Sequence, residues 1–257
     1  MFISAGSRGG RGRRIPRTSA AQIAAALPAG NTEPGQRLNP IISCEFMHQV
    51  TPNGDWYLSP VSAGAFVVAA STVPDAAHPG IVTVNSSTTA NSGGLISSNT
   101  LSILLGGGEQ FDCIWKTGAA FTATTTRLGF HDAQSVTDAV DGAYFEISAT
   151  GVIIGKTSNN SVQTSSATIT TLSVSTWYHM RVKLNAAATQ VDFTIYNMAG
   201  VVLGATSITT NIPTASGREC QPAFISTNSG TVATLLCSLD YISFCYQGRT
   251  LVRGALT

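Results

Sequence analysis

The side chains best suited to chemistry in this 257-residue chain gather in one acidic segment, HDAQSVTDAVDG, at residues 131–142. Loops that bring several carboxylate and carbonyl oxygens together can bind Ca²⁺, so Asp132, Asp138 and Asp141 are candidate ligands of a weak calcium site. Their spacing matches no EF-hand loop, however, and aspartates also cap turns, with Gly142 free to adopt a positive φ. Both interpretations stay open, and the sequence indicates no other cofactor.

Glycoside hydrolysis, a second kind of chemistry, needs two carboxyl groups about 5 Å apart, one as nucleophile and one as acid. On a strand such a pair would stand two or four residues apart, because alternate side chains share a face. None of the five glutamates has another carboxylate at either spacing, and Glu45 and Glu146 alternate with apolar neighbours as solvent-facing residues do. The chain also lacks a G-x-S-x-G elbow, a P-loop and an HExxH motif. We therefore expect no enzymatic activity.

Sugar binding would need aromatic side chains beside polar groups in a concave site. Trp56 and Tyr57, in the turn-rich stretch NGDWYLSP, and Tyr246 near the C-terminus are the candidate contacts for a glycan. Trp115 and Trp177 lie in strand-like runs, so we expect these two indole rings to serve the core instead.

The first forty residues read as a basic arm followed by a linker rich in glycine and proline. Five arginines precede position 18 and no acidic residue does, which leaves nine basic against thirteen acidic residues in the rest of the chain. With so few apolar side chains, the arm cannot offset the entropy cost of ordering itself. We expect it either to dock on another protein subunit or to be a solubilising tail. Nucleic acid is the less favoured partner, because no aromatic side chains interleave the arginines to stack on bases. The arginines concerned are Arg8, Arg11, Arg13, Arg14 and Arg17.

The segment at residues 174–213 indicates the fold, because two of its runs are apolar at every second position. This alternation predicts an antiparallel hairpin with one face in the core. The residues expected inside are Tyr178, Met180, Val182, Leu184, Val191, Phe193 and Ile195. Matching the two inner faces puts Asp192 opposite Lys183 or Arg181. After a turn at residues 197–200, a third strand is expected at residues 201–208.

This segment contains the run WYHMR, then VDFTIY, then a turn ending in glycine, an apolar strand and Ile-Pro. That order resembles the central meander of concanavalin-A-like, or laminin-G-like, jelly rolls, and in particular the module found in virion proteins of tailed bacteriophages. The stretches FDCIWK, RLGFHDA, DGAYFEIS and LDYISF fit the same pattern. The resemblance covers roughly residues 42–246 and implies an all-β, two-sheet antiparallel jelly-roll sandwich. Jelly rolls of this kind serve as lectins, enzymes and structural modules.

Composition narrows the class of protein further. Only 11% of the residues are charged, against about 25% in an average globular protein, whereas serine and threonine occupy 59 positions. A surface of hydroxyl groups suits a protein packed into an assembly. Five cysteines without CxxC spacing indicate buried, reduced thiols and synthesis in a reducing cytosol. No apolar run reaches the ~18 residues of a membrane span, and IAAAL near the N-terminus is too short for a secretory leader.

The sequence therefore predicts three parts: the basic arm and linker at residues 1–40, the jelly roll at 41–246 and a polar tail at 247–257. Besides the hairpin, strands are expected at residues 42–49, 65–70, 81–84, 101–105, 111–116, 124–130, 143–148, 152–154, 167–172, 221–226 and 232–246.

Together with the resemblance, these features predict a non-enzymatic structural protein of a phage virion, made in the host cytoplasm. A capsid decoration or cement protein is the first expectation, with the arm docked on the major capsid protein or other virion subunits and the jelly roll displayed outward as a homotrimer. One alternative is a receptor- or glycan-binding module of a tail or head fibre that contacts a host surface glycan. A second alternative is a lectin-like or glycosidase-like cellular domain.

Overall fold

The computed structural model describes residues 39–45, 56–61, 67–70, 78, 81–85, 93–98, 103–132, 137–228 and 236–246. All of these residues belong to one compact unit at residues 37–257. The arginine arm and the tail at residues 247–257 lie outside the described residues.

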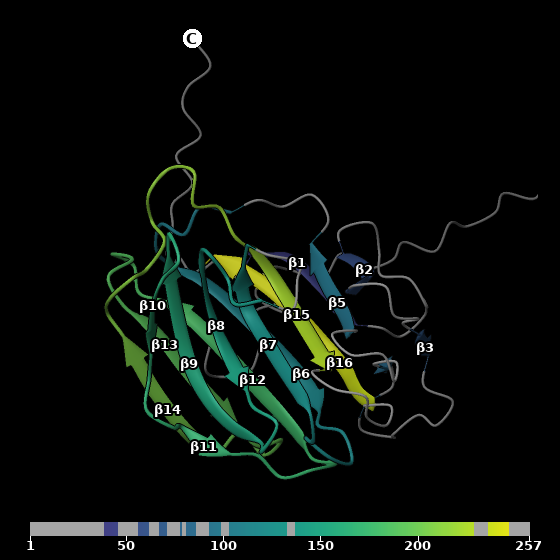
Figure 1. Cartoon of the computed structure of the whole chain (residues 1–257). Helices are drawn as coiled ribbons and strands as arrows, with labels where there is room; N and C mark the ends of the chain where they lie inside the picture. Colours follow the sequence, from purple (N-terminus) through teal and green to yellow (C-terminus); the bar gives the residue numbers. More distant parts are fainter. Residues whose placement is uncertain are drawn as a thin grey trace, which may run out of the picture. The chain divides into compact units, whose positions relative to one another are not determined.

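Every regular element in the described part of the chain is a β-strand, as Figure 1 shows. The strands are β1 (Asn39–Glu45), β2 (Trp56–Val61), β3 (Val67–Ala70), β4 (Val82–Asn85), β5 (Gly93–Ser98), β6 (Glu109–Lys116), β7 (Thr124–His131), β8 (Gly142–Ile147), β9 (Val152–Asn159), β10 (Val162–Ser165), β11 (Thr170–Thr171), β12 (Trp177–Leu184), β13 (Val191–Tyr196), β14 (Val202–Ile208), β15 (Gln221–Asn228) and β16 (Leu236–Tyr246). The all-β prediction is therefore confirmed.

The strands form two antiparallel sheets of eight strands each. Sheet A has the order β14-β13-β12-β6-β16-β4-β3, with β1 also paired to β16. Sheet B has the order β10-β9-β8-β7-β15-β5-β2, with β11 also paired to β9. Strands that neighbour each other within a sheet are often distant in the sequence, as in a jelly-roll sandwich.

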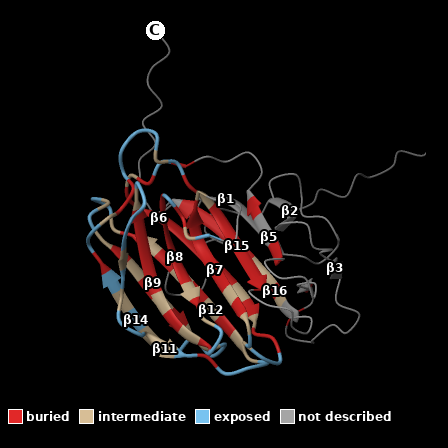
Figure 2. Cartoon of the chain, viewed as in Figure 1, coloured by how far each residue is buried: buried red, intermediate tan, exposed pale blue. Residues whose placement is uncertain are grey.

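The inner faces of the two sheets supply one hydrophobic core, which appears as the red strands in Figure 2. Phe193 of sheet A packs edge-on against Phe145 of sheet B, with ring centroids 5.2 Å apart. Gly155 on β9 leaves room for this contact, since a Cβ added there would lie 2.7 Å from Phe193 Cδ2. Trp115 is 2% exposed in the same core, as predicted.

The predicted hairpin is formed by β12 and β13, and all seven side chains expected inside are buried. Their register places Lys183 opposite Asp192, one of the two pairings that the alternation allowed. The prediction that Trp177 belongs to the core was wrong. This residue lies half-buried on the outer face, at the first position of β12. Its outward direction follows from the same alternation that turns Tyr178 inward.

Some of the other strand predictions also differ from the structure. Of the strand expected at residues 101–105, the described residues 103–105 contribute only an isolated bridge between Ile103 and Cys220. The strand expected at residues 152–154 continues to Asn159 and turns through Asn160 and Ser161, both with positive φ, into β10. Polar composition concealed this hairpin, because β9 and β10 are rich in serine, threonine and asparagine, which also dominate loops.

We expect Phe193→Ala to lower the free energy of unfolding by about 3 to 5 kcal/mol, because it leaves a cavity between the two sheets. Urea denaturation measures this loss. Val162→Ala, at a side chain that is 59% exposed, is the control and should change the free energy by less than about 0.5 kcal/mol. A loss below about 1 kcal/mol for Phe193→Ala would contradict the core position of this ring.

Candidate functional site

The acidic segment singled out in the sequence forms the loop between β7 and β8. Asp132 Oδ1 accepts a hydrogen bond from the amide of Val140 at 3.1 Å, and the amide of Asp132 donates to the carbonyl of Asp141 at 3.1 Å. Asp141 in turn accepts from the amide of Asn160 at 2.7 Å and lies 3.3 Å from Arg218 Nη1. Asp132 and Asp141 therefore close the neck of the loop.

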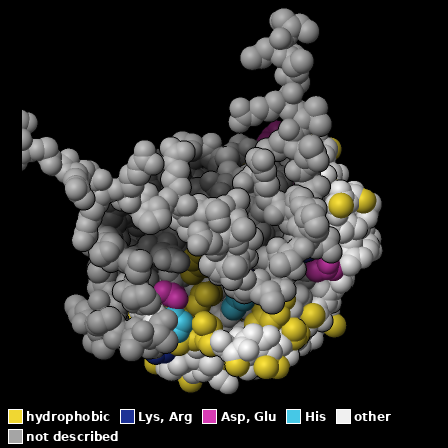
Figure 3. Space-filling model, turned by 180° about the vertical axis from the view of Figure 1, so that it is seen from behind, with side chains coloured by type: hydrophobic (Ala, Val, Ile, Leu, Met, Phe, Trp, Pro, Cys, Tyr) yellow, Lys and Arg dark blue, Asp and Glu magenta, His cyan; other side chains and the backbone are white. Residues whose placement is uncertain are grey.

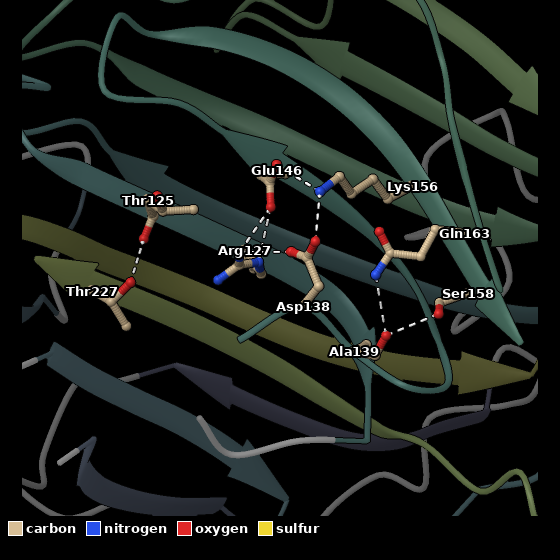
Figure 4. A network of polar contacts seen from close by, with 9 residues as sticks. All are labelled: Thr125, Arg127, Asp138, Ala139, Glu146, Lys156, Ser158, Gln163 and Thr227. Atoms are coloured by element: carbon tan, nitrogen blue, oxygen red, sulfur yellow. Dashed lines mark hydrogen bonds and ion pairs between the residues drawn. The ribbon is translucent and has the colours of Figure 1, made fainter. Parts of the chain in front are cut away.

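Asp138 points the other way, onto the outer face of sheet B, where it completes an ion-pair quartet with Arg127, Glu146 and Lys156 (Figure 4). Arg127 Nη2 lies 2.7 Å from Asp138 Oδ1 and 3.0 Å from Glu146 Oε2. Lys156 Nζ lies 3.1 Å from Asp138 Oδ2 and 2.8 Å from Glu146 Oε1. Both carboxylates thus bridge the same two cations, and strands β7, β8 and β9 are tied to the loop.

The two cations of the quartet are largely removed from water, since the Arg127 and Lys156 side chains are 9% and 10% exposed, whereas Asp138 is 35% exposed. Burial by itself would raise the pKa of Asp138, but the hydrogen bond from Lys156 and the charge of Arg127 lower that pKa from 3.8 to about 2. Asp132 behaves in the opposite way: burial, aided by the charge of Asp141, raises its pKa. The two aspartates of one loop therefore lie in opposite electrostatic environments.

The predicted calcium site finds no support in this geometry. Asp138 binds two cationic side chains, whereas Asp132 and Asp141 bind backbone amides at the neck of the loop. Within the described residues, no three His, Cys, Asp or Glu side chains are grouped so that they could hold a metal ion. The turn-capping interpretation accounts for Asp132 and Asp141, while Asp138 serves an ion pair that the sequence pattern did not indicate.

A second polar cluster lies on the outer face of sheet A around Asp112 of β6. Asp112 Oδ1 is 2.7 Å from His179 Nε2 and 2.8 Å from Arg181 Nε, both on β12. Although burial raises the pKa of Asp112, the hydrogen bond from His179 and the charge of Arg181 outweigh it and lower that pKa. Asp112 also raises the pKa of Arg181 against the effect of burial, so this pair is ionised.

Aromatic rings accompany this cluster. His179 stacks on Tyr196 with centroids 5.1 Å apart, and the Arg181 guanidinium lies 5.6 Å from the Tyr196 ring. Toward the start of β12, His78 stacks on Trp177 at 3.8 Å, and Lys116 Nζ lies 5.8 Å from the Trp177 ring. We call His78, Trp177, His179, Arg181 and Tyr196 the aromatic platform of sheet A. The rear view in Figure 3 shows histidine and acidic side chains beside hydrophobic ones on the described surface.

The acidic side chains that the structure describes on or beside the strands are bound by protein groups, while the side chain of Glu45 on β1 lies outside the described ones. Asp192 accepts from Gln190 at 2.6 Å and from Ser207 at 2.8 Å, and Asp240 lies 2.7 Å from His78 Nδ1. Glu109 is fully buried and accepts from the amides of Gly106 and Gly107 at 3.0 and 2.7 Å. With Asp112 and Glu146, these residues hold strands and loops in place.

Several residues predicted from the sequence lie outside the described side chains. Trp56 and Tyr57 begin β2, and Tyr246 ends β16, but only their backbone pairing is described. The five arginines of the arm lie outside the described residues altogether.

Of the cysteines, Cys113, Cys220 and Cys245 are free and buried, as expected. Burial and the nearby Asp112 raise the pKa of the Cys245 thiol to about 11, so it is protonated near neutral pH.

The two sheets, their order and their shared core define a jelly-roll sandwich of the concanavalin-like class. The family model described as "SO2946-like, C-terminal domain" matches residues 77–240, which is more than half of the sequence. The chain therefore belongs to the SO2946-like C-terminal domain family. No curated protein sequence matches it significantly.

Solved structures agree with this class of fold. Protein SO2946 of Shewanella oneidensis MR-1, described as of unknown function, superposes with a TM-score of 0.65 at 21% identity, covering 80% of this chain and 85% of that one. A Bacillus licheniformis β-glucanase gives a TM-score of 0.54 at 12% identity over 79% and 96% of the two chains. A carbohydrate esterase of Shiga toxin-encoding bacteriophage phi24B gives 0.50 at 14% identity over 81% and 99%. At these identities the likeness shows the fold alone.

No helix in the described residues is long and apolar enough to cross a membrane.

The depressed pKa of Asp138 predicts how the quartet responds to acid. A carboxylate whose pKa falls on folding stabilises the protein above its unfolded pKa and loses that contribution as pH drops through its folded pKa. The wild type should therefore be more stable than Asp138→Asn at neutral pH, and the difference should shrink between about pH 5 and pH 2. Thermal unfolding followed across this range measures the difference.

Asp132→Asn, in the same loop, is the matched control with the opposite sign. Because the pKa of Asp132 is raised in the folded protein, the stability of the wild type relative to this variant should increase as pH falls. Equal pH profiles for the two variants would contradict the assigned environments.

Proposed function

We propose that this chain is a non-enzymatic structural component of a bacteriophage virion, in which the basic arm anchors the protein and the jelly roll is displayed outward. A capsid decoration role is the specific form of this proposal, and the virion is its location. The observation that carries the non-enzymatic part is that the described strand carboxylates are bound by the protein itself.

Hydrolysis of a glycosidic bond on such a sandwich needs one carboxyl group that is protonated near the working pH and a second that is free to attack. Glu146, on the outer face of β8, is bridged by Arg127 and Lys156 at 3.0 and 2.8 Å. Asp112, on the outer face of β6, is bridged by His179 and Arg181. Groups held in this way are immobilised by their partners, which supports a sandwich used as a structural module.

The structural role is supported by the distribution of charge. Five arginines precede position 18, whereas only 11% of the whole chain is charged. An arginine-rich segment of this kind can bind carboxylates and carbonyls of another subunit through forked hydrogen bonds. The phage esterase with a similar fold shows that this sandwich occurs in a phage protein.

We expect deletion of residues 2–38 to abolish incorporation into the virion while the sandwich stays folded. The thermal midpoint should shift by only a few degrees, because the arm has few apolar side chains with which to stabilise the core. Copy number per particle, measured by quantitative mass spectrometry of purified virions, checks this outcome.

A charge-specific variant refines the same test. Changing Arg11, Arg13, Arg14 and Arg17 together to Ala should weaken incorporation in a salt-sensitive manner, because exposed charge pairs are screened by ions. Replacing the same four residues by Lys is the control for net charge: it keeps the charge but not the forked hydrogen bonds, so it should restore only part of the loss. A truncated protein that assembles at the normal copy number would show that attachment runs through the sandwich.

The aromatic platform of sheet A favours a second candidate, a glycan-binding module of a tail or head fibre. Sugars bind where an aromatic face stands beside hydrogen-bonding groups. Trp177, His179 and Arg181 follow one another at alternate positions of β12, which lies between β6 and β13. Tyr196 stands beside His179 on β13. The carbohydrate-active proteins with similar folds are consistent with this use of the outer face.

If the platform binds a glycan, Trp177→Ala should reduce affinity at least tenfold, which corresponds to about 1.4 kcal/mol. Binding of the full chain to host polysaccharide, followed by isothermal titration calorimetry, provides the measurement. Val162→Ala, on an edge strand of the other sheet, is the control.

Release of reducing ends from a glucan by the purified wild type would overturn the non-enzymatic assignment.

A further inference from the structure

Two long stretches of the sequence that contribute to one side of the sandwich contain no charged residue. Residues 157–178 and 193–217 contain no Asp, Glu, Lys or Arg. These two stretches include β10, the outermost strand of sheet B, and β14, the outermost strand of sheet A. The two stretches are in contact, since Thr164 Oγ1 of β10 lies 2.7 Å from Oγ1 of Thr210, which follows β14, and Asn211 Nδ2 donates to Thr164 at 2.9 Å.

The β14 edge is also apolar and open to solvent. Figure 2 shows part of β14 in the colour of exposed residues, and exposed positions alternate with intermediate ones before the buried Ile208. Leu203 is 43% exposed, and the preceding residues Met198, Val201 and Val202 are exposed as well. Within the part of the chain that the structure describes, β14 pairs with β13 along one side and with no strand along the other. The backbone groups of that free side are a ready template for a further strand.

Proteins normally protect such an edge with lysine, proline, inward-pointing charge or a covering loop. β14 has the sequence VLGATSI, which contains neither a charged residue nor proline. A bulge between Ile195 and Tyr196 disturbs the pairing only at its beginning, and Asp192 through Ile195 pair regularly with β14 residues beyond it. The edge thus lacks charged residues and proline, while Val202, Thr206 and Ile208 supply the residue types that favour strands.

We propose that β14 is an oligomerisation strand, which pairs antiparallel with β14 of a second copy of this chain and continues sheet A across a two-fold axis. Two-fold pairing places a strand against its own copy, so that any charge on it would meet the same charge. An uncharged strand meets this requirement. A partner that recognised the edge through charge would find no opposite charge between residues 193 and 217.

The geometry of pairing supplies the rest of the argument. In an antiparallel ladder about a two-fold axis, the free amides and carbonyls of one copy meet those of the other in the same alternation. Leu203, Ala205 and Ser207 are exposed and stand at alternate positions. They would form a continuous row with their counterparts, because alternate side chains share one face of the extended sheet. Association would bury the exposed Val202 and Leu203 side chains.

Such an interface is isologous and produces a dimer, or a larger assembly with an even number of subunits. It therefore differs from the homotrimer expected from the sequence, which would need two different surfaces in contact. The inference is independent of the proposed virion role, because pairing of β14 with its copy requires only the folded protein.

The test is sedimentation equilibrium of the full chain over a wide range of concentrations. The wild type should sediment as a reversible dimer. Leu203→Lys, which adds charge to the edge strand, should weaken dimerisation at least tenfold, and Ala205→Lys at the centre of the strand should do the same. Leu104→Lys is the matched control: this leucine is 38% exposed and precedes β6, three strands away in sheet A.

Near-UV circular dichroism and the thermal midpoint show whether each variant remains folded. The proposal is supported if both β14 variants are folded monomers while Leu104→Lys dimerises as the wild type does. A wild type that is monomeric at every concentration overturns it, as does a trimer. Dimerisation that survives both lysine substitutions in β14 would place the interface elsewhere.

Discussion

The structure depends on one constraint: side chains alternate across each strand, and the inner half of them must fill a single space between two sheets. Phe193 and Phe145 meet in that space, and Gly155 is a glycine because a larger residue would strike the Phe193 ring. Interiors pack as densely as organic crystals, so neither sheet can shift by one residue without turning its apolar side chains to water. The position of every outward side chain follows from this register.

The outward polar residues then have to satisfy one another. Arg127 and Glu146 stand directly opposite across β7 and β8, and Lys156 and Asp138 complete the pairing. Removing one member would leave a nearly buried charge without its partner, which is far more costly than the pair itself is stabilising. The same groups that could form a catalytic pair in a carbohydrate-active enzyme are here used to fasten a loop and three strands.

The arrangement of charge separates three regions of the molecule. The arm is basic in sequence, the outer faces of both sheets carry balanced ion pairs, and the sides formed by β10 and β14 carry no charge. Repulsion and desolvation favour contacts through the uncharged side, while the arm favours an acidic or carbonyl-rich partner. A protein organised in this way has surfaces suited to assembly, which is the physical basis of the proposed structural role.

Local pattern by itself determined the all-β class, the β12–β13 hairpin and its buried face, because period-two alternation is a property of adjacent residues. It limited the partner of Asp192 to Lys183 or Arg181, and the structure selected Lys183. It also placed His179 and Arg181 outward on β12, without indicating Asp112 as their partner. Only the tertiary structure decided that Asp138 binds Arg127 and Lys156, that Trp177 stacks on His78, and that the polar run after Ile154 forms a β-hairpin. These contacts join residues up to about a hundred positions apart, and their energy depends on burial, which exists only after the two sheets have packed together.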